Sequence, residues 1–229
     1  MGTTAEGGRG VLGEAAAAYV EDGMKVGLGT GRAAMSFVTA LAGRVRQGLT
    51  VVCVPTSEAT RRRAERLGLC LTTLAETCEL DLTIDGADEV DPRLDLIKGL
   101  GGALVREKIV AASSLRLMIV VGTEKIVERL GVHSPLPVEI VPFGLALCER
   151  RLAALGANPV LRKAAQGPFV SDNGNYILDC GFGGIGDPAA VNRAIREIPG
   201  VVETGLFIGM AERVLVQEGS AVRVLERAS

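Results

Sequence analysis

Acidic side chains are concentrated in one short stretch of the chain. The sequence DGADEVD, residues 85–91, contains four carboxylates and directly follows the apolar-patterned DLTI. Such a group can bind a divalent cation, orient hydroxyl groups or move protons. The spacing differs from that of a calcium-binding EF-hand loop, and the ammonium of Lys98 shortly afterwards would compete with a cation. We therefore expect proton and hydroxyl chemistry here and no metal ion.

A glycine-rich turn is the second candidate. GLGTGRAA, residues 27–34, joins an expected strand to an expected helix, where free backbone amides and the positive end of the helix dipole favour an anion such as phosphate. A tight connection without any ligand is the alternative. A dinucleotide-binding fold would need an acid about 20 residues on, at the end of the second strand. That strand ends TVVCVPTS, and no acid follows before Glu58, which disfavours a dinucleotide-dependent oxidoreductase.

Glu107 is the third candidate, between Arg106 and Lys108 near the start of an expected helix. It is either a general base or a solvent-facing residue in a charged helical turn. Adjacent helical side chains point about 100° apart, so its cationic neighbours need not pair with it. Burial would raise its pKa and the helix N-terminus would lower it, and the sequence leaves this balance open.

The elements that must position these residues alternate along the first half of the chain. Helical patterns at 11–21, 33–45, 57–68 and 104–114 alternate with strand-like runs at 24–29, 50–54, 80–84 and 115–121. This alternation predicts a parallel sheet of the α/β class, whose strands end at a common ligand-binding edge. We expect Ser57 to cap its helix, and Asp85 and Asp88 to line the same crevice as the glycine turn.

The pattern of apolar and turn-forming residues changes after His133. PLPVEIVPF is followed by helical patterns at 145–155 and 187–196, with FVSDNGNYILDC between them reading as two strands around a hairpin turn. We expect a βα-wound α/β unit over about the first 125 residues and a small α+β domain after His133. The closing strand-like runs VETGLFI, RVLVQ and AVRVL could join either sheet.

Composition excludes several classes of protein. The 229 residues are 48% hydrophobic, enough for a substantial core, and 25 Lys and Arg stand against 27 Asp and Glu, a net charge of −2. Without a basic block we expect no nucleic-acid partner, and apolar runs shorter than about 20 residues predict no membrane span. Five cysteines without a C-x-x-C pair read as buried thiols of a cytoplasmic protein, and a single histidine disfavours His-centred catalysis.

Seven longer motifs, spread over almost the whole chain, resemble those of a known protein family. GLGTGRAA, VPTSEAT, TIDGADEVD, LIKGLGGALVREKIVA, PLPVEIVPF, VSDNGNYILD and IPGVVETGLF, in this order, resemble the ribose-5-phosphate isomerase A family across almost the whole chain. The resemblance implies interconversion of ribose 5-phosphate and ribulose 5-phosphate in the non-oxidative pentose phosphate pathway. It also implies that no cofactor is needed and that the chain forms a homodimer or tetramer. The implied fold is a Rossmann-like catalytic domain, residues 1–131 plus 205–229, with a smaller α+β (ferredoxin-like) domain, residues 132–204.

The resemblance also implies the site. The phosphate loop falls on Thr30, Gly31, Arg32 and Ala33, the acidic loop on Asp85, Gly86, Ala87 and Asp88, the lysine–glycine loop on Lys98, Gly99, Leu100 and Gly101, the catalytic glutamate on Glu107, and a further substrate lysine on Lys125. Two positions depart from the family pattern. Arg32-Ala33 replace Ser-Thr, so that a guanidinium could grip phosphate, and Leu100 replaces a glycine.

The implied mechanism gives each residue type a role. We expect Glu107 to move a proton between C2 and C1 through a cis-enediolate, Asp85 to assist ring opening, Asp88 to orient hydroxyls and Lys98 to stabilise developing negative charge. We expect the remaining acids of this region, Glu89, Asp91 and Asp95, to be solvated loop residues. The alternatives are a non-catalytic sugar-phosphate sensor, which would need no Glu107, and the disfavoured oxidoreductase.

Overall fold

The computed structural model describes residues 3–227, and the side chains of residues 10–227. Contacts divide these residues into two units. The first comprises the residues up to Ala87, Arg106–Lys125 and those from Met210, and the second comprises Asp88–Val105 and Ile126–Gly209. The predicted domain division stays a prediction, but these contacts group residues 88–105 with the second unit.

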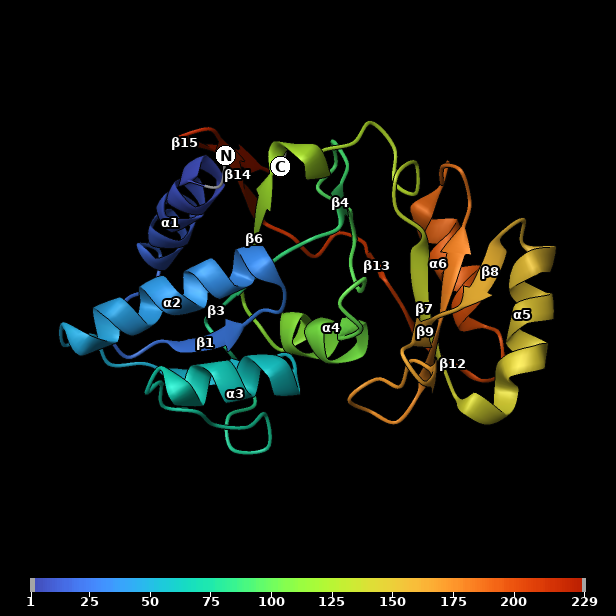
Figure 1. Cartoon of the computed structure of the whole chain (residues 1–229), viewed down its shortest axis with the longest axis horizontal. Coiled ribbons are helices and arrows are strands. Elements are labelled where there is room, and N and C mark those ends of the chain that lie inside the picture. The colour runs from blue at the N-terminus through green and yellow to red at the C-terminus, as the bar shows by residue number, and fades with distance from the viewer. Residues whose placement is uncertain (1–2, 228–229) are drawn as a thin grey trace. The chain divides into compact units, whose positions relative to one another are not determined.

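The first unit is built on a six-stranded sheet (Figure 1). The strand order is β15-β14-β6-β3-β1-β2, and all neighbours pair in parallel except β15, which is antiparallel to β14. The predicted α/β class with a parallel sheet is confirmed. The elements are α1 (Thr3–Ala17), β1 (Lys25–Leu28), α2 (Arg32–Arg46), β2 (Val52–Pro55), α3 (Glu58–Arg66), β3 (Leu82–Asp85), α4 (Leu104–Ala112), β6 (Leu117–Gly122), η1 (Thr123–Lys125), β14 (Arg213–Glu218) and β15 (Ala221–Glu226).

Burial patterns explain these elements. Every residue of β3 and the first five of β6 are buried, as expected for central strands of a parallel sheet covered on both faces. Helix α2 buries positions 34, 37, 38, 41 and 42, the spacing of one helical face, and Phe37 is fully buried in the core. Burial of one such side chain contributes about 1.5–3 kcal/mol. Ser57 caps α3 as predicted, because its side chain accepts a hydrogen bond from the N–H of Thr60.

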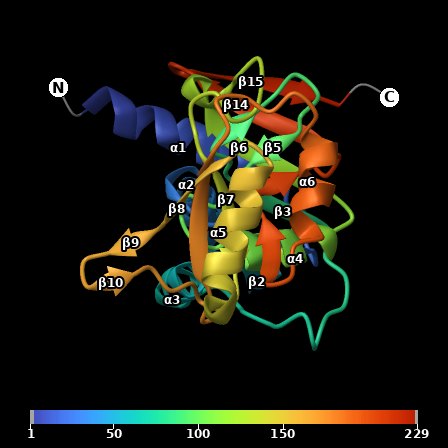
Figure 2. The same cartoon turned by 90° about the vertical axis from the view of Figure 1, so that its right-hand side faces the viewer.

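The second unit is built on a four-stranded antiparallel sheet with the order β12-β7-β11-β8, and Figure 2 labels β7, β8, α5 and α6 of this unit. The connection β7-α5-β8-β11-α6-β12 is the βαββαβ pattern of the predicted ferredoxin-like sheet. A three-stranded sheet, β13-β5-β4, and the hairpin β9-β10 complete the unit. The elements are β4 (Glu89–Val90), β5 (Leu96–Ile97), β7 (Leu136–Ile140), η2 (Pro142–Gly144), α5 (Leu145–Ala154), β8 (Asn158–Leu161), β9 (Lys163–Ala164), β10 (Gly167–Pro168), β11 (Tyr176–Gly181), α6 (Pro188–Arg196), β12 (Val201–Thr204) and β13 (Leu206–Phe207).

The predicted hairpin around Asp-Asn-Gly-Asn is wrong in its first strand. Only the residues after the turn form a strand, β11, and residues 169–171 belong to no strand. The physical reason is that the turn closes on itself, with the N–H of Ser171 bonded to the carbonyl of Asn175, while its polar side chains bind Glu139. The open question of the closing runs is also answered. VETGLFI contributes β12 and β13 to the second unit, and β14 and β15 join the main sheet.

Two further expectations concern the thiols and the helices. All five cysteines are free, and Cys53, Cys148 and Cys180 are buried. Cys70 and Cys78 are exposed, so the prediction of five buried thiols is wrong for these two, which lie in the irregular segment between α3 and β3. None of the helices in the described part of the chain combines the length and apolar character that a membrane crossing requires.

Candidate active site

The glycine turn after β1 lies beside the end of β3. These strands are parallel neighbours, and the chain continues from β1 through α2 to β2 on one side but from β3 to β6 on the other. Such a reversal is the switch point at whose carboxyl edge open α/β sheets bind ligands. The residues at this edge are Gly29 and Thr30 after β1, and Asp85 to Ala87 at the end of β3.

Asp85 is held tightly at this junction. A Cβ on Gly29 would lie only 2.2 Å from Asp85 Oδ1, so only glycine allows this approach. The Asp85 side chain is 1% exposed, and its Oδ1 accepts hydrogen bonds from the N–H of Thr30 at 3.0 Å and from the N–H of Gly86 at 2.7 Å. These two bonds fix the orientation of the carboxylate. The structure therefore brings together Asp85, Gly86 and Thr30 from two motifs 55 positions apart.

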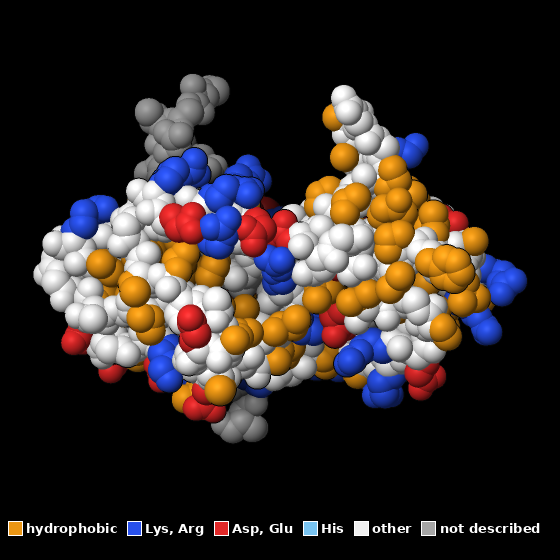
Figure 3. All heavy atoms as spheres, turned by 90° about the horizontal axis from the view of Figure 1, so that it is seen from below, with side chains coloured by type: hydrophobic (Ala, Val, Ile, Leu, Met, Phe, Trp, Pro, Cys, Tyr) orange, Lys and Arg blue, Asp and Glu red, His pale blue; other side chains and the backbone are white. Residues whose placement is uncertain are grey.

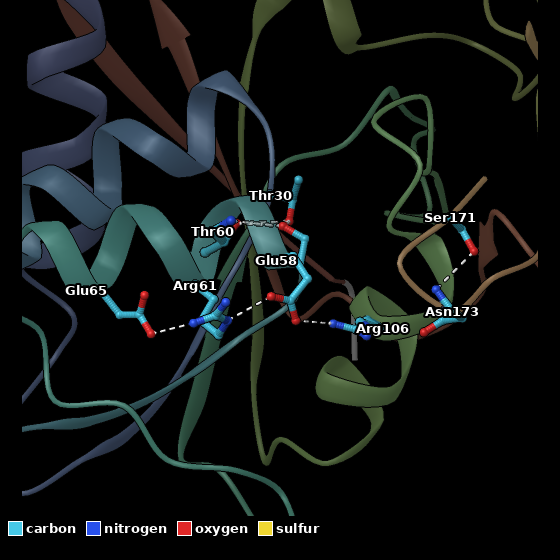
Figure 4. Close-up of polar contacts among 9 residues, drawn as sticks. Thr30, Glu58, Thr60, Arg61, Glu65, Arg106, Ser171 and Asn173 are labelled. Carbon is cyan, nitrogen blue, oxygen red and sulfur yellow. Dashed lines mark hydrogen bonds and ion pairs between the residues drawn. The ribbon is translucent and has the colours of Figure 1, made fainter. Parts of the chain in front are cut away.

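A cluster of hydroxyl groups supports the glycine turn (Figure 4). Thr30 Oγ1 lies 2.8 Å from Thr56 Oγ1, 2.8 Å from Ser57 Oγ and 3.1 Å from Thr60 Oγ1. Thr60 Oγ1 also donates a hydrogen bond to the carbonyl of Gly29 at 3.0 Å. Sequence reasoning missed this cluster, apart from Ser57 as a helix cap. Its signal was the three hydroxyl residues in TSEAT directly after β2, where a dinucleotide fold would carry an acid.

The N-terminus of α2 follows this turn and can bind an anion. Gly31 is its N-cap residue, with a φ of 93° that favours glycine, and no side chain caps the helix. The first-turn amides are therefore available to an anion. Arg32, the first helical residue, is exposed, and Ala33 is partly buried. The contact between Arg32 and phosphate stays a prediction.

Glu107 is buried, at 5% exposure, in the first turn of α4. The alternative of a solvent-facing glutamate is therefore wrong. Three residues further on, Val110 packs against β1, with its Cγ1 2.8 Å from the place that a Cβ on Gly27 would occupy. Residues three apart share a helical face, so Glu107 lies on the sheet-facing side, about 4.5 Å nearer the start of the helix. Because α4 leads into the parallel strand β6, its start lies towards the carboxyl edge that carries Asp85 and Thr30.

Arg106, which precedes Glu107 in the sequence, forms an ion pair with Glu58. Arg106 Nη1 lies 3.0 Å from Glu58 Oε1, and Glu58 Oε2 accepts a hydrogen bond from Arg61 Nε at 2.8 Å (Figure 4). Hydrogen bonds from Arg61 and then Arg106 hold the pKa of Glu58 below its ordinary 4.5. This ion pair joins the first turn of α3, which carries Thr60 of the hydroxyl cluster, to the first turn of α4, which carries Glu107.

Lys125 also lies at the carboxyl edge of the sheet. It ends η1, which directly follows β6, and its side chain is partly buried. Strand β6 is the parallel neighbour of β3. Gly86 lies between the glycine turn after β1 and strand β6. A Cβ on Gly86 would lie 3.6 Å from the carbonyl oxygen of Thr30 and 3.9 Å from that of Val120.

The second unit carries Asp88 and the lysine–glycine loop, which is defined here as residues 98–102. Asp88 Oδ2 accepts a hydrogen bond from the N–H of Leu100 at 2.9 Å, and the N–H of Asp88 bonds to the carbonyl of Ile97 at 2.8 Å. Asp88 therefore fixes the backbone of this loop, while its expected action on substrate hydroxyls stays a prediction. Gly99 has a φ of 108°, whereas Leu100 and Gly101 are exposed.

Lys98 is 2% exposed, which is unusual for a lysine. Its Nζ lies over the ring of Phe207, 5.4 Å from the ring centroid, a cation–π contact. Its N–H bonds to the carbonyl of Gly205 at 2.9 Å, and a Cβ on Gly205 would lie 2.2 Å from the Lys98 carbonyl oxygen. The start of the loop is therefore packed tightly against the chain near β13.

The expectation that Glu89, Asp91 and Asp95 are solvated is wrong. They are 1%, 7% and 5% exposed, respectively. The carboxylate of Glu89 accepts hydrogen bonds from the N–H groups of residues 131, 133 and 134 at 2.5–2.8 Å. Asp91 accepts from the N–H groups of residues 93 and 95, and Asp95 from that of residue 209. Each acid is buried because it satisfies backbone donors of an irregular segment.

Candidate metal ligands are sparse in the described part of the chain. Among residues 3–227, no three or more His, Cys, Asp or Glu side chains are grouped so as to hold a metal ion. The single histidine, His133, is exposed. The candidate site is therefore described by carboxylates, hydroxyls, backbone amides and lysines.

Comparison with known proteins gives a consistent family. The model of the family described as ribose 5-phosphate isomerase A (phosphoriboisomerase A) matches residues 52–220. A ribose-5-phosphate isomerase A from Gloeobacter violaceus is 58% identical over 207 residues, which cover 90% of each chain. One from Roseiflexus castenholzii is 56% identical over 216 residues, covering 93% of this chain and 92% of that protein.

Solved structures agree with the sequence matches. Ribose 5-phosphate isomerase A from Methanocaldococcus jannaschii has a TM-score of 0.92 at 38% identity, covering 96% of this chain and 99% of that one. A D-ribose-5-phosphate isomerase in complex with phospho-erythronic acid has a TM-score of 0.94 at 34% identity, covering 97% and 99%. Together with the arrangement of Asp85, Glu107 and the glycine turn, these matches show that the chain belongs to the ribose 5-phosphate isomerase A family.

Proposed function

We propose that this chain interconverts D-ribose 5-phosphate and D-ribulose 5-phosphate, an aldose–ketose isomerisation. One observation carries the proposal within the family. The buried carboxylate of Glu107 faces the sheet near the carboxyl edge at which the glycine turn and Asp85 meet. A carboxylate and an anion-binding helix N-terminus on the same edge are the two parts that an isomerase of phosphorylated sugars requires.

Proton transfer is the central step. Glu107 removes the proton from C2 of the open-chain aldose, and electrons move to the carbonyl oxygen to give a cis-enediolate. The same carboxylic acid then returns a proton to C1 while the hydroxyl proton on O2 moves to O1, which leaves the carbonyl at C2 of the ketose and regenerates the carboxylate. One carboxylate serves both carbons because they are neighbours, and a positioned general base of this kind contributes about 10²–10⁴-fold to the rate.

The other site residues prepare and stabilise this step. Asp85, oriented by the N–H groups of Thr30 and Gly86, assists ring opening by moving a proton between sugar oxygens. Lys98 stabilises the negative charge that develops on oxygen in the enediolate. Asp88 both orients substrate hydroxyls and holds the backbone of the lysine–glycine loop. No cofactor takes part in these steps.

Phosphate recognition anchors the substrate away from the reacting carbons. The uncapped amides at the start of α2, the guanidinium of Arg32 and the ammonium of Lys125 form the phosphate site. Remote binding energy of this kind fixes the reacting carbons against the base. The relative that was solved with phospho-erythronic acid supports a ligand of this class, a short phosphorylated sugar acid.

The test is a direct assay of ribulose 5-phosphate formation by purified protein, with and without EDTA. Glu107→Gln keeps the shape of the side chain but removes the base, so kcat should fall by about 10²–10⁴-fold while KM changes little. Glu128→Gln, at an exposed glutamate, is the matched control and should leave both constants unchanged. Unimpaired turnover by the Glu107 variant would refute the assigned base. Binding without turnover by the unmodified chain would instead indicate a sugar-phosphate sensor.

We also propose that the chain acts as a cytoplasmic homodimer. Five free thiols, two of them exposed, suit a reducing compartment. The second unit exposes apolar side chains, which Figure 3 shows gathered on one face, and Phe143 is fully exposed beside Val141. A second copy of the chain would cover such a surface. Sedimentation of wild type against Phe143→Asp measures this association, and an unchanged monomeric mass in both would contradict it.

A further inference from the structure

Two carbonyl groups of the lysine–glycine loop accept hydrogen bonds from one guanidinium. Arg162 Nη1 donates hydrogen bonds to the carbonyl of Gly99 at 2.9 Å and to that of Leu100 at 3.1 Å. The N–H of Leu100, which belongs to the same peptide unit as the Gly99 carbonyl, bonds to Asp88. Gly99 and Gly102 have φ values of 108° and 83°, so the loop follows a path that ordinary side chains disfavour. Because glycine populates many backbone conformations, this loop depends on external partners to keep one of them.

Arg162 is itself fixed by a bidentate ion pair. Its Nε donates to Asp179 Oδ2 at 2.9 Å, and its Nη2 bonds to Asp179 Oδ1. The side chains of Arg162 and Asp179 are only 12% and 22% exposed, so solvent weakens this pair less than a surface pair. Asp179 lies in β11, and Arg162 directly follows the partner strand β8, with its N–H bonded to the carbonyl of Ile177 in β11 at 2.9 Å, so both are attached to the four-stranded sheet. The planar guanidinium of Arg162 therefore fixes the lysine–glycine loop relative to the four-stranded sheet.

Phe169 connects the same guanidinium to the far end of the loop. The Arg162 guanidinium lies 5.7 Å from the centroid of the Phe169 ring, and the N–H of Phe169 bonds to the carbonyl of Arg162 at 2.8 Å. The ring covers the α-carbon of Gly102, because a Cβ there would lie 2.4 Å from Phe169 Cζ. Arg162 and Phe169 together therefore contact residues 99, 100 and 102 of the loop that begins at Lys98.

The segment that follows Phe169 is anchored in the sheet as well. Glu139 of β7 is fully buried, and its Oε1 accepts hydrogen bonds from Ser171 Oγ at 2.9 Å, Asn173 Nδ2 at 3.1 Å and Asn175 Nδ2 at 2.9 Å. Figure 4 shows Ser171 and Asn173 side by side in this turn. The Asp-Asn-Gly-Asn motif therefore closes over a buried carboxylate, which keeps Phe169 in place above Gly102.

We infer that Arg162, oriented by Asp179, is a positioning residue for catalysis: it sets the lysine–glycine loop so that Lys98 is presented in one conformation. The inference rests on the proposed function, in which Lys98 stabilises the enediolate. Arg162 acts through the loop backbone and does not touch the reacting atoms. A lysine at this position would keep the charge but lose the fork, since it cannot bind Asp179 through two nitrogens and reach two carbonyls at once.

The closing experiment compares Arg162→Lys and Arg162→Ala with wild type. Both should lower kcat by about 10–100-fold with less than about a threefold change in KM, because Arg162 is not among the proposed phosphate-binding residues and a misplacement of about 1 Å has effects of this size. Arg223→Lys is the matched control. Its ion pair with Glu218 joins two exposed side chains, and kcat should not change. Low millimolar guanidinium chloride should restore part of the activity of Arg162→Ala only, while equal sodium chloride should not.

A readout independent of activity completes the design. Hydrogen exchange of the peptide that contains residues 98–102 should be at least tenfold faster in Arg162→Lys than in wild type, and unchanged in the Arg223 control. A variant with full kcat, or with unchanged exchange in this peptide, would overturn the inference. An inactive wild type together with faster exchange in the variant would instead refute the proposed function while leaving the bracing of the loop intact. Arg162→Lys retains the charge, so it remains informative if the alanine variant fails to fold.

Discussion

Gly29 offers the sharpest single test of the site geometry. In Gly29→Ala, the new Cβ would lie 2.2 Å from Asp85 Oδ1 and 2.5 Å from Asp85 Cα. Neither contact can be relieved by a flexible side chain, because one of the atoms is backbone and the carboxylate is bound to two N–H groups. The turn and the end of β3 must therefore separate by about 1 Å, and overpacking of this kind costs about 1–3 kcal/mol.

The same displacement should reach catalysis. A shift of about 1 Å in a reacting group can lower the rate by about 10²-fold, which corresponds to about 2.7 kcal/mol in the barrier. Urea unfolding and steady-state kinetics with ribose 5-phosphate measure the two effects separately. Gly43→Ala is the control, since the nearest atom to its Cβ is Arg46 Nη2 at 3.9 Å and it lies inside α2. This control should gain about 1 kcal/mol in stability. Wild-type stability and kcat in Gly29→Ala would refute the described approach of β1 to β3.

Three further predictions concern the thiols and the buried acid Glu89. Burial raises the pKa of Cys53 and Cys180 from 9.0 to about 12. The folded state holds these thiol protons more tightly than the unfolded state does. The associated stability is therefore present below pH 9 and is lost as the pH rises towards 12. Urea titrations should give a lower free energy of unfolding at pH 10.5 than at pH 8. In native protein at pH 8, a thiol reagent should modify Cys70 and Cys78 alone, and reaction of five thiols would contradict the described burial. Glu89→Ala leaves three backbone donors unpaired and should lower the free energy of unfolding by about 1–3 kcal/mol; an unchanged urea midpoint would show that water replaces the carboxylate.

Local patterns in the sequence were sufficient for the framework of the first unit. The alternation of helical and strand-like runs reports burial on both faces of a parallel sheet, and this predicted the order of β1, α2, β2, α3 and β3. The edge that gathers Asp85 and the glycine turn follows from topology alone. Ser57 was found as a cap because capping depends on residues close in the sequence.

Contacts between distant residues explain what the sequence did not reveal. Glu89 looks like a loop acid in its own neighbourhood, and it is buried only because donors more than 40 positions away converge on it. The Asp-Asn-Gly-Asn turn reads as a hairpin, yet its side chains bind Glu139 on another strand. Arg162 carries no local signal of its partners in the lysine–glycine loop, which lie 62 and 63 positions away.

The strand order of the main sheet has a consequence for biosynthesis. Strand β6 is almost wholly apolar, and its partner on one side, β14, is made only after the intervening residues 126–209 have left the ribosome. Until then, β6 of the nascent chain has an unpaired, hydrophobic hydrogen-bonding edge. Such edges promote aggregation. Chains that stall between β6 and β14 should therefore be the ones that most need chaperones, and a gene that ends before Arg213 should yield insoluble protein.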